Sequence, residues 1–212
     1  MSIEADSAPH VVSGDLSDSL FRALADQPMI ACDLETSGLD WRVERIGTIQ
    51  LFSPSTGTVI LQASSRPPDL LAALMQRPSV VKVFHHAPFD LGFLQADWSI
   101  TTRNVRCTKV ASKLAFPEAP SSDHSLASLL RTQLGVAVAK GSVRTSDWMS
   151  SELTAEQIEY AANDVRFLLP LLGNLTHLLE QRGRLDLYHE CCSFLPSHAR
   201  LETGGFPDIF SY

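Results

Sequence analysis

The chain has 212 residues, of which 44% are hydrophobic and 19% charged, which is typical of one globular domain and excludes a disordered or low-complexity protein. No apolar run approaches the roughly 18 residues of a membrane span and residues 1–10 do not resemble a signal peptide, so we expect a cytoplasmic protein. The net charge of −7 by itself argues against a nucleic-acid partner.

The N-terminal part of the chain predicts one helix and several strands. A short strand or turn at residues 10–13 precedes the helix, and strands follow at residues 29–35, 46–52 and 58–61. The Ser-Pro-Ser-Thr-Gly turn between the last two strands favours a hairpin. The helix is indicated by apolar side chains at helical spacing and by two candidate N-caps, namely Leu16, Leu20, Phe21 and Leu24 with Asp15 or Ser17.

The rest of the chain predicts strands that alternate with helices, followed by a mainly helical part. The expected elements are a helix at 69–76, a strand at 80–84, a helix from Pro88, a strand at 105–108 and helices from Lys109 onward. A polar loop at residues 139–151 precedes a helix whose N-cap is Thr154 and whose capping-box partner is Gln157. This order predicts an α/β fold with a mixed sheet of five to six strands flanked by helices.

One domain is expected, because the linkers are short and the composition does not change along the chain. Residues 1–28 would form an N-terminal segment and first helix that pack on the domain at residues 29–195, and residues 196–212 would form a tail. That tail carries four large apolar side chains after a diglycine: Phe206, Ile209, Phe210 and Tyr212. Since chain ends are normally polar, the tail docks either on its own domain or on a second subunit of a homo-oligomer.

Asp33 and Glu35 lie two residues apart at the end of an apolar predicted strand, so their side chains project to the same face. This end of the strand precedes a glycine-containing turn, at the rim of the sheet where α/β sites form. Two carboxylates that face one way repel each other unless a cation binds between them. Taken alone, such a pair is more often a harmless exposed strand end.

Two further acids follow at later elements. Asp90 lies in the first turn of a predicted helix after a buried strand, where the helix dipole alone would favour an acid. Tyr160 and Asp164 are four residues apart on a predicted helix and share one face. Each acid alone is most simply a surface residue. The set, in this order and at these separations, indicates a site.

The residues around these acids resemble the three motifs of the DEDD superfamily of 3′→5′ exonucleases. Asp33-Leu-Glu-Thr-Ser-Gly-Leu resembles the first motif, and Phe84-His-His-Ala-Pro-Phe-Asp90 is similar to the second. Tyr160-Ala-Ala-Asn-Asp164 is similar to the third in its tyrosine form, because the histidine form would place His at position 159, which is Glu. The chain is therefore identified as a member of the tyrosine subclass.

From about Met29 to Tyr212 the chain also resembles short ribonuclease D-like proteins of the nanoRNase C group. The likeness is carried by Cys107-Thr-Lys-Val-Ala-Ser-Lys-Leu, by the Ser146-Asp-Trp148 element and by the terminal Phe-Pro-Asp-Ile-Phe. It implies a ribonuclease H-like exonuclease fold without the helical HRDC domains of full ribonuclease D. It also implies assembly into a homo-oligomer.

The resemblance implies a catalytic centre with two divalent cations, which hard carboxylate ligands select as Mg²⁺ or Mn²⁺ rather than zinc. Asp33 would contact both cations, Glu35 and Asp164 would complete the one on the nucleophile side, and Asp90 would hold the other. Two cations about 4 Å apart suit the in-line displacement of a phosphodiester. Tyr160, with an ordinary pKa near about 10, would orient the attacking water rather than act as a base.

The resemblance also implies substrate contacts. Thr36 would bind the terminal 3′-hydroxyl, and Leu39 would separate the last two bases or simply pack in its turn. His85 would touch phosphate or ribose, although a histidine satisfied at a strand end is the alternative. Lys140 would contact phosphate or remain solvated.

The charge distribution bears on the substrate. Residues 101–150 contain seven basic and three acidic side chains, a net charge of +4, so the rest of the chain carries −11. A local basic surface beside an acidic metal centre fits a nucleic-acid end. We expect release of nucleoside 5′-monophosphates from RNA or short oligoribonucleotides. The alternatives are a DNA 3′→5′ exonuclease of repair or proofreading type and a non-catalytic nucleic-acid-binding module.

Overall fold

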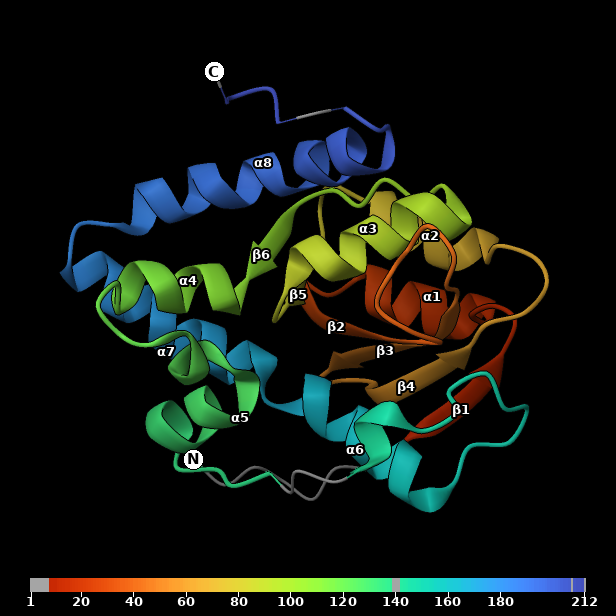
Figure 1. Ribbon diagram of the computed structural model, residues 1–212. Helices are drawn as coiled ribbons and strands as arrows, with labels where there is room; N and C mark the ends of the chain where they lie inside the picture. The colour runs from red at the N-terminus through yellow and green to blue at the C-terminus, as the bar shows by residue number, and fades with distance from the viewer. Residues whose placement is uncertain (1–7, 139–141, 207, 212) are drawn as a thin grey trace.

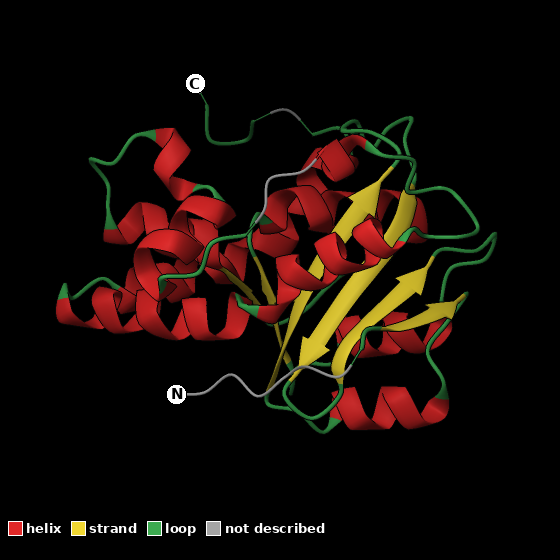
Figure 2. Cartoon of the chain, turned by 90° about the horizontal axis from the view of Figure 1, so that it is seen from below, coloured by secondary structure: helices red, strands yellow, loops and turns green. Residues whose placement is uncertain are grey.

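A six-stranded mixed sheet forms the centre of the computed structural model, which describes residues 8–138, 142–206 and 208–211 (Figure 1). Its strands are β1 (His10–Ser13), β2 (Met29–Thr36), β3 (Ile46–Ser53), β4 (Gly57–Gln62), β5 (Val81–Phe84) and β6 (Val105–Cys107). They lie side by side in the order β1-β4-β3-β2-β5-β6 (Figure 2). Strand β3 is antiparallel to β2 and β4, whereas β2, β5 and β6 are parallel. The predicted mixed α/β sheet is confirmed.

Helices cover both faces of this sheet. They are α1 (Asp18–Ala25), α2 (Asp69–Gln76), α3 (Ala87–Trp98), α4 (Thr108–Ala115), α5 (Leu126–Leu129), α6 (Ala155–Arg166), α7 (Leu168–Gln181) and α8 (Leu185–Thr203). In Figure 1, α1, α2 and α3 lie above the strands, and α6 lies below them against β2, β3 and β4. Because both faces are covered, β3 is buried almost along its whole length.

The helix ends follow the predicted capping signals. Ser17 is the N-cap of α1, since its hydroxyl accepts a hydrogen bond from the Leu20 amide at 3.3 Å. Asp15, the other candidate, instead accepts from the amides of Leu70 and Leu71 at the start of α2. The α6 capping box forms as predicted from Thr154 and Gln157.

Two elements differ from the sequence prediction. Helix α8 runs on through Pro196 to Thr203, so the boundary drawn at residue 195 falls inside a helix and the tail begins after it. The predicted loop at residues 139–151 contains a 3₁₀ turn at Ser142–Thr145 and a buried Trp148, and its residues 139–141 lie outside the described part of the chain. The Trp148 carbonyl packs so closely on Gly47 of β3 that no larger side chain fits there.

A membrane span is not found among the described helices, because none is both long and apolar enough to cross a bilayer.

Candidate active site

The acid pair of β2 meets a third acid from α6. Asp33 and Glu35 lie on one face of β2, and α6 crosses this face. One carboxylate oxygen from each of Asp33, Glu35 and Asp164 lies within 4.8 Å of the others. The strand spacing and the helix spacing predicted from the sequence therefore bring these three side chains together.

Asp90 adds a fourth carboxylate beside this group. It lies in the first turn of α3, directly after β5, which is parallel to β2. Its side chain is only 3% exposed, and its negative charge helps to raise the pKa of Asp33. Asp90 is outside the group of three whose carboxylate oxygens lie within 4.8 Å of one another.

The protein raises the pKa of three of these acids. Burial raises the pKa of Asp33 well above its ordinary value, and the charges of Asp164, Asp90 and Glu35 raise it further. Burial raises the pKa of Asp90 to about 8 and that of Asp164 to about 7. The Tyr160 hydroxyl donates a hydrogen bond to Asp164 and opposes this rise. A cluster with these properties binds cations or protons at neutral pH.

The donor set fits Mg²⁺ or Mn²⁺. The four side chains offer only hard carboxylate oxygens, which these cations prefer. The nearest thiol, Cys32, lies on the opposite face of β2 and is buried in the hydrophobic core. A zinc site built on sulfur or imidazole is therefore not supported by the described residues.

In the metal-free protein, the melting temperature is expected to fall as the pH rises from about 4 to about 8. The folded-state pKa values of Asp90 and Asp164 lie above the ordinary value of 3.8, so the folded protein binds more protons than the unfolded chain in this window. Those protons, and the stability they confer, are lost as the pH rises. A divalent cation should reverse the trend, because it takes the place of the protons.

Melting curves in EDTA and in Mn²⁺ across this pH window measure both effects. The stabilisation by Mn²⁺ should be smallest at the acid end. An equal stabilisation at every pH would contradict the prediction.

The residues predicted to bind the substrate differ in how accessible their side chains are. Leu39 is 86% exposed on the turn after β2, so its side chain is accessible. The Thr36 hydroxyl donates to the Gly38 carbonyl at 2.6 Å, which leaves its oxygen able to accept a hydrogen bond. Lys140 lies outside the described residues.

His85 is held within the fold more firmly than the sequence indicated. Its Nδ1 atom lies 2.9 Å from the Thr108 hydroxyl at the start of α4. Burial, together with the charge of Lys109, lowers the pKa of His85 to about 3, so the ring is neutral at physiological pH. Lys109 and Lys113, two basic residues of the 101–150 segment, also lower the pKa of His86 and therefore lie close to this edge of the site.

Two polar residues of the site were not predicted. Gln50 and Thr48 of β3 are fully buried and lie opposite Asp33 and Glu35 in the β2–β3 pairing. The sequence signal was present, because they alternate along an otherwise apolar strand. The strand register was needed to show that they lie opposite Asp33 and Glu35.

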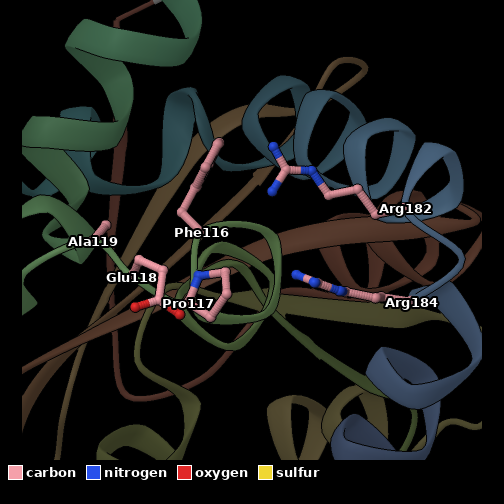
Figure 3. A pocket seen from close by; sticks show the side chains of 6 residues that line it. All are labelled: Phe116, Pro117, Glu118, Ala119, Arg182 and Arg184. Carbon is pink, nitrogen blue, oxygen red and sulfur yellow. The ribbon is translucent and has the colours of Figure 1, made fainter.

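A separate hollow of about 480 Å³ lies at the other end of α4 (Figure 3). It is lined by Phe116, Pro117, Glu118, Ala119, Arg182 and Arg184. Arg184 donates to the Leu114 carbonyl at 2.7 Å, and Arg182 donates to the Ala115 carbonyl. Since these are the last carbonyls of α4, both arginines cap the helix, and the hollow is structural.

The acid cluster and its position define the class of protein. Carboxylates that can share a divalent cation, at this edge of a mixed sheet flanked by helices, are typical of a metal-dependent phosphodiester hydrolase. The tyrosine that contacts Asp164 agrees with the tyrosine form of the third exonuclease motif.

Comparison with known proteins identifies the family. Residues 11–180 match the family described as 3′-5′ exonuclease, and the chain belongs to this family. Ribonuclease D of Escherichia coli is 29% identical over 185 residues, which cover 87% of this chain and 48% of the relative. This chain thus spans about half the length of the curated ribonuclease D relatives.

A solved structure matches over nearly the whole of both chains. Brucella melitensis NrnC is 30% identical with a TM-score of 0.87, and the match covers 97% of this chain and 98% of that chain. NrnC has been solved with bound Mg²⁺ and bound to pGG. Escherichia coli RNase D has a TM-score of 0.77 at 26% identity, over 90% of this chain and 51% of that one. The ribonuclease D-like resemblance and the ribonuclease H-like exonuclease fold are confirmed.

Proposed function

We propose that this protein is a 3′→5′ exoribonuclease that releases nucleoside 5′-monophosphates, with short oligoribonucleotides as its preferred substrates. The proposal is carried by Asp33, Glu35 and Asp164, whose carboxylates lie within reach of a shared cation. It is supported by the likeness to NrnC, which has been solved bound to pGG. A cytoplasmic location, where such fragments arise, is part of the proposal.

Each catalytic residue has a distinct role in this proposal. Asp33, Glu35, Asp90 and Asp164 hold two divalent cations, which when bound stabilise the attacking and leaving oxygens of an in-line displacement. Tyr160, which hydrogen-bonds Asp164, orients the attacking water.

In the same proposal, four further residues bind the substrate. Thr36 accepts from the 3′-hydroxyl, and Leu39 separates the last two bases. His85 contacts ribose or phosphate as a neutral ring, and Lys140 contacts phosphate.

Hydrolysis of an RNA dinucleotide is expected to have a higher kcat/KM than hydrolysis of longer RNA or of the matching DNA dinucleotide. The overall acidic charge leaves little surface to follow a long backbone, and an enzyme that contacts few phosphates should show a shallow dependence on salt. Release of mononucleotides from labelled strands measures this preference. EDTA should stop the reaction, and Mg²⁺ or Mn²⁺ should restore it.

Two outcomes would contradict this reading. Faster degradation of long duplex DNA than of dinucleotides would favour a DNA repair or proofreading enzyme. Nucleic-acid binding without metal-dependent hydrolysis would favour the non-catalytic module.

We further propose that the protein is a homo-oligomer held partly by its C-terminal segment. Phe206, Ile209 and Phe210 are 61%, 54% and 76% exposed. Among the described aromatic side chains, the ring of Phe210 contacts only that of Phe194, in an edge-on arrangement with the ring centroids 5.7 Å apart. Figure 1 shows the C-terminal end of the chain beside α8, on the side of the molecule opposite α6. Burial of one Phe contributes roughly 1.5–3 kcal/mol, so a second subunit would gain from covering these side chains.

Deletion of residues 205–212 is therefore expected to lower the mass measured by light scattering, while the domain stays folded. A Phe206→Ser, Phe210→Ser double variant is a second test of the same contact, because it removes apolar area without shortening the chain. An intact protein that is a monomer at micromolar concentration would refute the proposal before either variant is made.

A further inference from the structure

Two polar side chains are completely buried beside the acid pair of β2. Gln50 lies directly opposite Asp33 in the antiparallel pairing, and Thr48 lies opposite Glu35. Directly opposed residues project to the same face of a sheet with their Cβ atoms about 5 Å apart. Both Gln50 and Thr48 are 0% exposed. The Gln50 amide and the Thr48 hydroxyl therefore lie on the same face of the sheet as the carboxylates of Asp33 and Glu35.

Only one half of the Gln50 amide has a hydrogen-bond partner. Its Nε2 atom donates to the Thr48 hydroxyl oxygen at 2.5 Å. Its Oε1 atom is buried and has no hydrogen-bond partner within the part of the chain that the structure describes. A buried acceptor without a donor destabilises a fold, and a Met or Leu of similar volume would avoid that cost. Such a group beside a candidate active site indicates a hydrogen-bond partner that is present only when the site is occupied.

The surroundings of Gln50 limit what this partner is. On the side away from Asp33, Gln50 is paired with Ile60 of β4. Ile60 packs with Trp148 and with Ala161 of α6 in a small apolar cluster that covers this side. On β2 and β3 the polar neighbours of the amide on this face are Thr48 and the acid pair, while on β4 the Gln62 amide donates to the carbonyls of Ser150 and Ser151. Mg²⁺ and Mn²⁺ sites retain several waters, which are strong hydrogen-bond donors.

We infer that Gln50 is a positioning residue of the catalytic centre, an inference that rests on the proposed function. When cations are bound, its Oε1 atom would accept a hydrogen bond from water that hydrates the acid cluster beside Asp33. Gln50 would thereby fix the hydration of the acid cluster beside Asp33.

Gln50→Met tests this inference because it keeps the volume and removes the amide. The dissociation constant for Mn²⁺, measured by titration calorimetry, should rise about tenfold or more, as it does when outer partners of metal ligands are removed. The kcat should fall while the KM for an RNA dinucleotide stays unchanged. In EDTA the variant should melt at a higher temperature than the wild type, because the unpaired oxygen is gone.

Gln62→Met is the matched control. Gln62 lies on β4, and its amide donates to the carbonyls of Ser150 and Ser151 at 3.3 and 3.2 Å, so its loss should lower the melting temperature and leave Mn²⁺ binding unchanged. Gln50→Asn, which shortens the amide, provides a second variant if Gln50→Met does not fold, and should also weaken Mn²⁺ binding.

Equal Mn²⁺ dissociation constants for wild type and Gln50 variants would overturn the inference. Failure of the wild type to hydrolyse RNA in Mn²⁺ would instead count against the proposed function, and the calorimetric comparison separates the two.

Discussion

Asp33→Asn and Asp164→Asn are each expected to abolish hydrolysis while the domain stays folded. The amide of Asn is nearly isosteric with the carboxylate but carries no charge and is a poor ligand for Mg²⁺ or Mn²⁺. Each change removes one of the three carboxylates that lie within 4.8 Å of one another. We expect the turnover to fall by about 10³-fold or more, at the upper end of what a single electrostatic contact in an active site contributes.

The same variants should be more stable than the wild type in EDTA. Burial and mutual repulsion raise the pKa of Asp33, which means that its charged form is disfavoured in the metal-free fold. A neutral Asn removes this penalty, so the melting temperature should rise and depend less on pH. Addition of Mn²⁺ should then stabilise the variants less than it stabilises the wild type.

Asp40→Asn is the matched control, because Asp40 is an exposed acid on the turn after β2 that pairs only with Arg42 among the described residues. Its activity and its response to Mn²⁺ should equal those of the wild type. If both Asp33→Asn and Asp164→Asn keep a substantial part of the wild-type turnover, these acids do not hold the catalytic cations.

The acids could be found in the sequence because the patterns that place them are local. A spacing of two on a strand puts Asp33 and Glu35 on one face, and a spacing of four on a helix does the same for Tyr160 and Asp164. Asp90 is different. Its approach to Asp33 depends on β5 lying parallel to β2, a non-local pairing that the motif resemblance supplied and the residues alone did not.

The contacts that escaped prediction join segments far apart in the chain. Asp15 caps α2 rather than its own helix, a contact with Leu70 and Leu71 that no local pattern indicates. The pairing of Gln50 with Asp33 depends on the β2–β3 register, which shifts between Glu35 and Thr36. A slip of one residue would have turned Gln50 to the opposite face, so the sequence could not assign it to the site.

The course of α8 could not be predicted for a different reason. Proline usually ends a helix, because its ring clashes with the preceding turn and it lacks an amide hydrogen. Here Pro196 lies inside α8, next to Leu195, which packs into the hydrophobic core. Tertiary packing of α8 on α3 and α4 therefore outweighs the local signal.

Replacing Tyr160 with Phe is expected to lower the turnover by about 10²-fold or more, with little change in substrate binding. The Tyr160 hydroxyl contacts Asp164, and its ring packs near Trp148 with the ring centroids 6.1 Å apart. Phe preserves this packing and removes only the hydroxyl, so the variant isolates the hydrogen bond. If the hydroxyl orients the attacking water, its loss affects the step in which the water attacks and not the binding of the RNA 3′ end.

The structure also predicts a change at Asp164 in the same variant. Burial raises the pKa of Asp164 to about 7 even though the Tyr160 hydrogen bond lowers it. Without the hydroxyl this pKa should rise, so the pH dependence of Mn²⁺ binding should shift to higher pH. Steady-state kinetics on an RNA dinucleotide, together with Mn²⁺ titrations at several pH values, measure both effects. A variant that changes mainly KM, with kcat preserved, would show that Tyr160 contacts the substrate rather than the water.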